Sequence, residues 1–273
     1  MRWALQALIG FVATAFAVYV VLIIALFFFQ RLLLYHPNQT VPDPAEFGVA
    51  EMAVVQVPTE DGFNLLGWWR APRDETQPVI AYFHGNSGHI GTRVDKVRDY
   101  LDAGYGVLLL SYRYNAGSGG SPSEDVLLAD ARAGLAFLKN KGIAGARIVP
   151  YGESLGSGAA VAMAATQPVG ALVLEAPYDN MAKLAQHHYW YTPARWLVRD
   201  TLDSASRIGK VSAPILIVHG ERDRIIPQKF ARRLFEAAPK PKEAHFLPEA
   251  RHNDLLDYGL TRFVIDFLDR NFK

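Results

Sequence analysis

Short runs of apolar residues recur through most of this chain, separated by segments of helical length. Each run is apolar throughout rather than at every second position, which is typical of strands buried on both faces. Such strands occur in parallel sheets that helices cover on both sides. The predicted strands are "PVIAYFHG", "YGVLLLSYR", "RIVPYGES", "GALVLEAP", "APILIVHG" and "KEAHFLP", and the predicted helices cover 91–102, 155–166, 227–238, 254–272 and a segment that starts at Ser123 and Glu124. The pattern predicts an α/β fold with a mainly parallel sheet and helices on both faces.

Two segments depart from this alternation. "MAVVQV" and "NLLGWWR" flank the turn "PTEDGF", which predicts a hairpin and therefore an antiparallel start to the sheet. Residues 178–210 are too long for an ordinary connection and contain the aromatic and basic stretch "HHYWYTPARWLVRD". This insertion is either a helical excursion packed on the sheet or a cap that lines a substrate pocket. We favour a small helical cap within a single α/β domain over 51–273.

The N-terminal segment lies outside the globular pattern. Residues 3–29 carry no charge, and a bilayer core needs about 20 apolar residues in a helix. The alternative is a signal peptide, whose apolar region is usually about 7–15 residues long. Here the apolar run continues through "VYVVLIIALFFF". The sequence therefore predicts an uncleaved, single-pass transmembrane anchor over 1–30, followed by a Pro-rich connector over 31–50.

Charge and cysteine content narrow the choice of function classes. Arg2 and the α-amine precede the apolar run and Arg31 follows it, a small bias that places the N-terminus in the cytoplasm and the domain on the non-cytoplasmic side. The net charge of +1 gives no reason to expect a nucleic-acid partner. The chain has no cysteine, which excludes disulfides, thiol chemistry and Cys-ligated zinc.

The segment "IVPYGESLGSGAA" places Ser154 between two glycines, where a predicted strand meets a predicted helix. Gly-x-Ser-x-Gly alone is weak evidence because glycine and serine are common residues. At a strand–turn–helix junction, however, such a serine exposes its hydroxyl at the C-terminal edge of the sheet. Gly152 and Gly156 would let the strand and the helix approach closely. Ser154 is therefore predicted to be a nucleophile rather than a small residue in a tight turn.

A serine nucleophile needs a general base, and the base needs a carboxylate that orients it. In this architecture the chain order is serine, acid, histidine, with the acid after a late strand. Asp223 follows "APILIVHG", and His252 lies between the last predicted strand and the last predicted helix. The alternative interpretations are a turn or capping carboxylate and a surface-loop histidine. Because order and placement agree for all three residues, we predict a triad of Ser154, Asp223 and His252.

The developing negative charge on a substrate oxygen requires an oxyanion hole of two N–H donors. One is expected from the backbone of Leu155, directly after the predicted nucleophile. The other is expected from the loop after the "VIAYFHG" strand, and we assign it to the backbone N–H of Asn86 in "HGNSG". His84, in the same loop, is interpreted as structural.

Other polar residues are weaker candidates. Asp179 is the alternative acid, since some related arrangements place the acid after the strand that follows the nucleophile helix. His187 and His188 lie in the insertion, where a solvated face is favoured over substrate contact, and His219 is expected to make a core or turn contact. No cluster has metal-ligand spacing and no phosphate-binding loop is present, so no metal or cofactor is predicted.

The motifs "HGNSG", "GESLGSG", "EAPYDN", "PILIVHGERDRIIP" and "RHND" resemble the α/β-hydrolase superfamily over about residues 50–273. The combination is similar to membrane-anchored ABHD-type proteins, a branch described as serine-aminopeptidase-like. The resemblance implies the α/β-hydrolase fold and catalytic roles for the residues already singled out: Ser154, Asp223, His252, Asn86 and Leu155. Arg251 departs from the family pattern, in which glycine usually precedes the histidine. Some eukaryotic relatives in this branch remove fatty acyl groups from protein cysteines.

Three functions are compatible with these features. The first is a membrane-anchored serine hydrolase that cleaves carboxylic ester or thioester bonds in a small-molecule or lipid acyl substrate. The aromatic residues of the insertion favour an apolar acyl group, and the pocket candidates are Tyr178, Tyr189, Trp190 and Trp196. The second is a serine aminopeptidase-like peptidase that removes N-terminal residues, which would need a carboxylate such as Glu153 or Asp179 to hold the substrate's amine. The third is a non-catalytic membrane interaction protein that has kept the fold.

Overall fold

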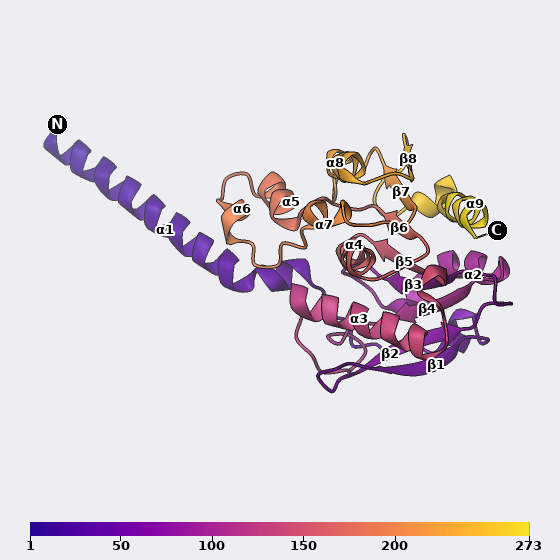
Figure 1. The fold of residues 1–273 in the computed structure, drawn as a ribbon. Helices are drawn as coiled ribbons and strands as arrows, with labels where there is room; N and C mark the ends of the chain where they lie inside the picture. The colour runs from indigo at the N-terminus through magenta and orange to yellow at the C-terminus, as the bar shows by residue number, and fades with distance from the viewer. Residues whose placement is uncertain (273) are drawn as a thin grey trace.

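A computed structural model describes residues 1–272 of the chain. Figure 1 shows an α/β domain from which the N-terminal helix α1 (Arg2–Leu34) projects. The strands are β1 (Ala53–Pro58), β2 (Asn64–Arg70), β3 (Val79–Phe83), β4 (Gly106–Leu110), β5 (Ile148–Glu153), β6 (Leu172–Glu175), β7 (Ile215–Gly220) and β8 (Lys242–Leu247). The other α-helices are α2 (Val94–Asp102), α3 (Glu124–Asn140), α4 (Gly156–Thr166), α5 (Met181–His188), α6 (Ala194–Leu197), α7 (Ser204–Ile208), α8 (Lys229–Ala237) and α9 (Leu260–Asn271).

The strands form one sheet in the order β1-β2-β4-β3-β5-β6-β7-β8. The β1–β2 and β2–β4 pairs are antiparallel, and the pairs from β4–β3 to β7–β8 are parallel. The predicted mainly parallel sheet with an antiparallel start is therefore confirmed. Because parallel strands end at the same edge, the loops after β3, β5, β7 and β8 meet on one side of the sheet, where open α/β sheets bind ligands.

Helices cover both faces of the sheet, as the continuously apolar strands indicate. Val79, Ala81 and Phe83 of β3 belong to a core shared with α3, α4 and α8. Ile80 and Tyr82, the alternate residues, point to the core shared with α2 and α9. Figure 1 shows these two helical layers on opposite sides of the sheet.

Three segments differ from the sequence-based expectation. The helix predicted over 254–272 is divided into a 3₁₀ turn (Leu255–Tyr258) and α9, because Gly259 takes a left-handed conformation with φ of 86°. The helix predicted over 91–102 begins as a 3₁₀ turn (Ile90–Arg93) before α2. The insertion over 178–210 contains three short helices, α5 to α7, and we call this segment the cap.

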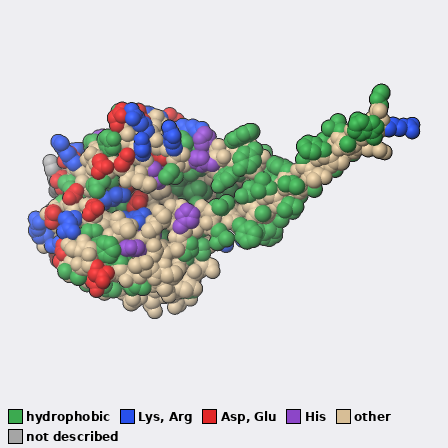
Figure 2. Space-filling model, turned by 180° about the vertical axis from the view of Figure 1, so that it is seen from behind, with side chains coloured by type: hydrophobic (Ala, Val, Ile, Leu, Met, Phe, Trp, Pro, Cys, Tyr) green, Lys and Arg blue, Asp and Glu red, His purple; other side chains and the backbone are tan. Residues whose placement is uncertain are grey.

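Helix α1 is longer than the predicted anchor. It continues past residue 30 and ends at Leu34, so the first residues of the predicted connector are helical. Among residues 1–272 it is the helix that is long and apolar enough to cross a membrane, judged by length and composition, with a mean hydropathy of 2.8 over its most apolar window. Figure 2 shows hydrophobic side chains all along α1, whereas charged side chains gather on the part of the domain away from it.

Candidate active site

Ser154 lies in the sharp turn between the end of β5 and the start of α4. Its φ of 50° is in the left-handed region, which is unusual for a residue with a side chain. Gly152 and Gly156 are required because neighbouring backbone atoms approach them too closely for a side chain. A Cβ atom on Gly152 would lie 2.4 Å from the Cα of Ser157, and one on Gly156 would lie 2.0 Å from the carbonyl oxygen of Phe83. The turn therefore has the strained geometry expected of a nucleophile elbow.

A chain of hydrogen bonds links Ser154 to His252 and Asp223. Nε2 of His252 lies 2.9 Å from Oγ of Ser154, and Nδ1 of His252 lies 2.6 Å from Oδ2 of Asp223. The other carboxylate oxygen of Asp223 accepts from the backbone N–H groups of Ile225 and Ile226, each at 2.8 Å. The Asp223 side chain is fully buried. The imidazole is thereby oriented with Nε2 toward the serine, where it can accept the hydroxyl proton.

His219 supports the loop that carries Asp223. Its Nε2 donates to the carbonyl of Ile226 at 2.8 Å and lies 3.5 Å from Oδ2 of Asp223. Burial lowers the pKa of His219 to about 4, although the Asp223 carboxylate opposes the shift. His219 is therefore neutral near neutral pH. It makes the core contact that was predicted for it.

The lowered pKa of His219 predicts acid destabilisation. In the unfolded chain its pKa returns to 6.5, so between 6.5 and about 4 only the unfolded chain binds the proton. The contribution of His219 to the free energy of unfolding is complete above pH 6.5. It is lost as the pH falls toward 4, by about 1.4 kcal/mol for each pH unit. Thermal melts at about pH 7 and about pH 5 should show a larger drop for wild type than for His219→Gln, whose amide can still donate to Ile226. Equal drops would contradict the assignment.

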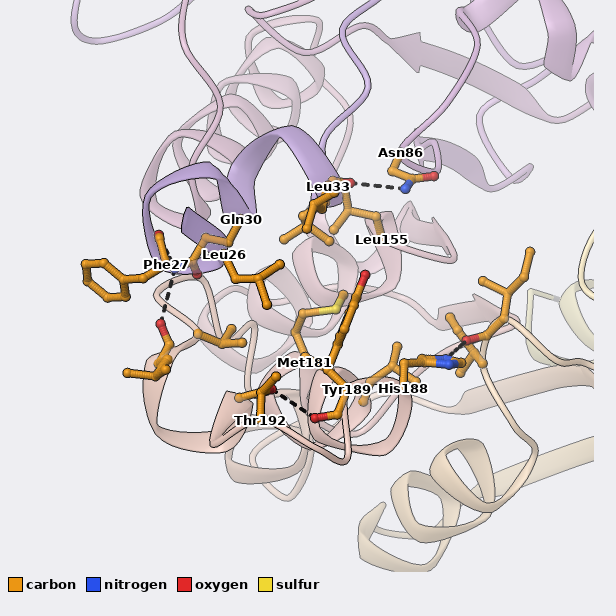
Figure 3. Close-up of a pocket in the computed structure, with 18 of the residues that line it drawn as sticks. Leu26, Phe27, Gln30, Leu33, Asn86, Leu155, Met181, His188, Tyr189 and Thr192 are labelled. Atoms are coloured by element: carbon orange, nitrogen blue, oxygen red, sulfur yellow. Dashed lines mark hydrogen bonds between the residues drawn. The ribbon is translucent and has the colours of Figure 1, made fainter. Parts of the chain in front are cut away.

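Asn86 and Leu155, the predicted oxyanion-hole residues, line the same cavity as Ser154. The Asn86 side chain donates to the carbonyl of Leu34 at 3.1 Å, and its carbonyl accepts from the N–H of His36 at 3.2 Å. These bonds tie the loop after β3 to the end of α1, and Figure 3 shows the bond from the Asn86 side chain. Within residues 1–272 neither the Asn86 nor the Leu155 N–H donates to a protein acceptor, so both are free to donate to a ligand.

The loop is also held from beneath by His84. The carbonyl of His84 accepts from the hydroxyl of Tyr112 at 2.8 Å, and its Nδ1 lies 2.7 Å from the carbonyl of Gly85. Burial lowers the pKa of His84 to about 3, which keeps the ring neutral. The contacts agree with the structural role that was predicted for this histidine.

Ser154 lines an apolar cavity of about 460 Å³. Three segments form its walls: the C-terminal turns of α1, the cap, and the loop after β7. Figure 3 shows Leu26 and Leu33 of α1 on one side and Met181 and Tyr189 of the cap on the other. The side chains that meet here are mostly aliphatic, so the cavity is suited to an apolar group bonded to the carbon that Ser154 would attack.

The four residues predicted to line the pocket lie in different surroundings. Tyr189 lines the cavity, but Trp190 and Trp196 are exposed on the outside of the cap, at 78% and 79%. Tyr178 is fully buried, and its hydroxyl donates to the carbonyl of Leu155 at 3.1 Å, behind the nucleophile turn. The aromatic content of the insertion did not indicate which side chains face inward.

The structure shows further residues that line the cavity. His188 is exposed, as expected, but it also lines the cavity, and its Nε2 lies 2.8 Å from the carbonyl of Ile225. The C-terminal turns of α1 were assigned wholly to the membrane anchor and the connector. Hydropathy alone gave no signal for their role, because a wall of an apolar cavity and a lipid-facing surface have the same composition.

Beneath the nucleophile turn lies a buried cluster of charges. Arg93 donates to both carboxylate oxygens of Glu153 at 3.1 Å, and Nζ of Lys96 lies 2.6 Å from Oε1 of Glu175. Burial disfavours the charge on Glu153, but Lys96 and Arg93 hold its pKa well below the usual range. Its oxygens are already occupied, so Glu153 is not placed to hold a substrate's amine.

Asp179, the alternative acid, is engaged elsewhere. Its carboxylate accepts two hydrogen bonds from Arg233, at 2.7 and 3.2 Å, and its side chain is 1% exposed. It is Asp223 that bonds to His252. Across the residues that the structure describes, no group of three or more histidine, aspartate and glutamate side chains could hold a metal ion.

The sheet order and the turns that carry Ser154, Asp223 and His252 define an α/β-hydrolase fold. Comparison with known proteins identifies the branch. The model of the family "Serine aminopeptidase, S33" matches residues 194–258. An uncharacterised protein of Mycobacterium tuberculosis is 37% identical over 246 residues, covering 88% of this chain and 86% of its own. The chain therefore belongs to the α/β-hydrolase superfamily, and the family model that it matches is that of the serine-aminopeptidase-like branch.

Other relatives extend the comparison. The protein bem46 of Schizosaccharomyces pombe is 29% identical, covering 90% of this chain and 88% of its own. The lysophosphatidylserine lipase ABHD12 of Danio rerio is 30% identical over 64% of this chain and 51% of its own. An esterase of Pyrococcus furiosus has a similar structure, with a TM-score of 0.71 and 21% sequence identity, covering 87% of this chain and 100% of that chain. The family match and the lipase relative support a hydrolase, and the esterase structure shows the same fold.

Proposed function

We propose that the protein is a membrane-anchored serine hydrolase that cleaves carboxylic ester or thioester bonds through Ser154, His252 and Asp223. The observation that carries this proposal is the hydrogen-bond chain from Asp223 to His252, at 2.6 Å, and from His252 to Ser154, at 2.9 Å. It ends at an apolar cavity. A serine in such a chain is activated, because the base that takes its proton is already oriented.

The reaction proceeds in two halves. Ser154 Oγ attacks the acyl carbon while its proton passes to Nε2 of His252, and Asp223 stabilises the resulting imidazolium. The oxygen that gains negative charge accepts hydrogen bonds from the N–H groups of Leu155 and Asn86. His252 then gives its proton to the leaving alcohol or thiol, and the acyl-enzyme forms. Water, deprotonated by His252, then attacks the acyl-enzyme; the bond to Oγ of Ser154 breaks as His252 returns the proton to that oxygen, and the carboxylic acid is released.

The cavity lining favours an acyl substrate over a peptide amine. A peptidase that removes N-terminal residues needs an anion to hold the substrate's ammonium group. The described residues that line the cavity include no carboxylate. The carboxylates of Glu153 and Asp179 are already paired with Arg93 and Arg233, respectively. Hydrolysis of an ester or thioester is therefore the preferred activity, and aminopeptidase activity is the less supported alternative.

Membrane anchoring is proposed from α1, which is exposed along its N-terminal part and uncharged over residues 3–29. The packing of its C-terminal turns on the cap favours an uncleaved helix over a removed signal peptide, since removal would open one side of the cavity. The side of the membrane on which the domain lies is proposed from the arginine distribution alone, as the non-cytoplasmic side.

The direct test is labelling of the purified full-length protein with a fluorophosphonate probe. Stoichiometric labelling is expected, because the probe reacts with an activated serine. His252→Ala should label far more slowly, since Ser154 would lose its base. Hydrolysis of p-nitrophenyl esters and acyl thioesters would then establish the reaction class. A folded wild-type protein that neither labels nor hydrolyses would refute the proposal and favour a non-catalytic membrane role.

A further inference from the structure

Helix α1 has two parts that differ in their surroundings. Residues 1–19 are exposed along the whole of this part. From there on, half-buried positions recur three or four residues apart, and they include Val20, Ile23, Phe27, Gln30 and Leu34. This spacing places them on one face of the helix. The C-terminal turns of α1 therefore pack on the domain through one face and leave the other exposed.

The apolar length of α1 exceeds what a bilayer requires. At 1.5 Å per residue, residues 3–22 alone extend for about 30 Å, which is the thickness of a typical hydrocarbon core, about 30 Å. The helix has 33 residues and continues to Leu34. Residues 23–34 are therefore available for contacts with the domain at the membrane surface.

This surplus part of α1 is a wall of the cavity that contains Ser154. Ile23, Leu26 and Leu34 line it, and Leu26 faces the cap residues Met181 and Tyr189 in Figure 3. From Ile23 to Leu34 the helix rises about 16 Å. One leaflet of a bilayer contributes about half of the 30 Å core, so the wall has about the length of one lipid acyl chain.

Polar contacts fix the wall against the cap. Arg31 donates two hydrogen bonds to Asp200, at 2.8 and 3.0 Å, and the Asp200 side chain is 5% exposed. The Gln30 side chain donates to the carbonyl of Leu197 at 3.2 Å and accepts from the N–H of Arg199 at 2.7 Å. Gln30 and Arg31 are half-buried and paired within an otherwise apolar helix, which indicates a specific packing arrangement, so the wall is a defined part of the site.

The two ends of the wall differ in what they contact. At Leu34 the backbone carbonyl accepts from the side chain of Asn86, whose loop supplies a proposed oxyanion-hole donor. At the other end, Ile23 adjoins the exposed part of the helix. A chain bound along the wall would therefore have its carbonyl at the Leu34 end and its tail toward the bilayer.

We propose that the cavity-lining side chains between residues 23 and 34 of α1 form the acyl-chain wall of the active site, and that the cavity takes a single acyl chain of an ester or thioester dissolved in the same bilayer. The inference rests on the hydrolase function proposed above. It adds that α1 determines which acyl lengths are accepted, with Leu26 as a specificity-determining residue.

The test uses the full-length protein in bilayer nanodiscs and p-nitrophenyl esters from butyryl to palmitoyl. Leu26→Trp would fill the cavity, so kcat/KM for the long-chain esters should fall by at least about 10-fold while that for the butyryl ester is retained. Ile24→Trp is the matched control, because Ile24 is 50% exposed and does not line the cavity. It should change neither rate. Leu26→Ala should shift the preference toward longer chains.

Several outcomes would overturn this role of α1. One is a wild-type protein that prefers the butyryl ester, and another is a folded Leu26→Trp protein with unchanged chain-length preference. Equal effects of Leu26→Trp and Ile24→Trp would also overturn it. In each case continued fluorophosphonate labelling would leave the hydrolase function intact, whereas absence of labelling and of all ester hydrolysis would refute that function itself. The intact mass of the purified protein should include residues 1–34, since their cleavage would remove the wall.

Discussion

Replacing Ser154 with alanine is expected to lower kcat for ester hydrolysis by roughly 10⁶-fold, the loss seen when a serine nucleophile is removed from an intact triad. The base and the acid would stay in place, because His252 is held by Asp223 at 2.6 Å independently of the serine. Only the attacking oxygen would be missing. The measurement is the single-turnover and steady-state rate with a p-nitrophenyl ester, together with fluorophosphonate labelling.

Two control variants separate chemistry from folding. Ser118 also lies between two glycines, but in a loop rather than at a strand–helix junction, so Ser118→Ala should retain the wild-type rate. Ser154→Gly should be as inactive as Ser154→Ala yet no less stable in a thermal melt, because glycine adopts a φ of 50° without strain. Wild-type turnover by a folded Ser154→Ala protein would exclude this residue as the nucleophile.

Replacing Lys96 with methionine is expected to reduce the free energy of unfolding by about 3–5 kcal/mol, the usual cost of leaving a buried charge without its partner. The charge left behind is that of Glu175, whose side chain is 2% exposed and whose Oε1 lies 2.6 Å from Nζ of Lys96. Tyr151 would be its remaining side-chain partner, at 2.7 Å. For a domain of this size the melting temperature should fall by roughly 6–20 °C.

A double-mutant cycle tests whether charge is the cause. Glu175→Gln removes the unpaired negative charge and keeps an oxygen that can accept from Tyr151. The Lys96→Met, Glu175→Gln double variant should therefore regain most of the stability that Lys96→Met loses. A double variant as unstable as the single one would show that the loss comes from Glu153, 3.8 Å from Nζ of Lys96, or from packing around residue 96.

The arrangement of the proposed triad was predictable because it follows from topology. Ser154, Asp223 and His252 each come directly after a strand of the parallel part of the sheet. The carboxyl ends of such strands lie at one edge, so sequence order and strand position are enough to bring these side chains together. The glycines at 152 and 156 could likewise be interpreted from sequence, since they mark where backbone segments approach closely.

The cavity and the charge cluster could not be predicted in the same way. Trp190 and Trp196 have the composition of pocket residues, but short cap helices give too little periodicity to show which face points inward. The partners Lys96 and Glu175 are 79 residues apart, and nothing local in the sequence connects them. For α1, hydropathy identified the helix but could not separate its lipid-facing residues from those that line the cavity.

The proposed continuity of α1 from a membrane to the cavity has a kinetic consequence. An enzyme held in the same bilayer as its substrate meets that substrate in two dimensions, so the relevant concentration is the mole fraction of substrate among the surrounding lipids. Diluting the vesicle suspension with buffer should then leave the turnover per enzyme unchanged. Diluting the substrate with inert lipid inside the vesicle should slow it, because each molecule must diffuse laterally to reach the helix. The composition of the surrounding membrane would thus set the rate as directly as the amount of substrate does.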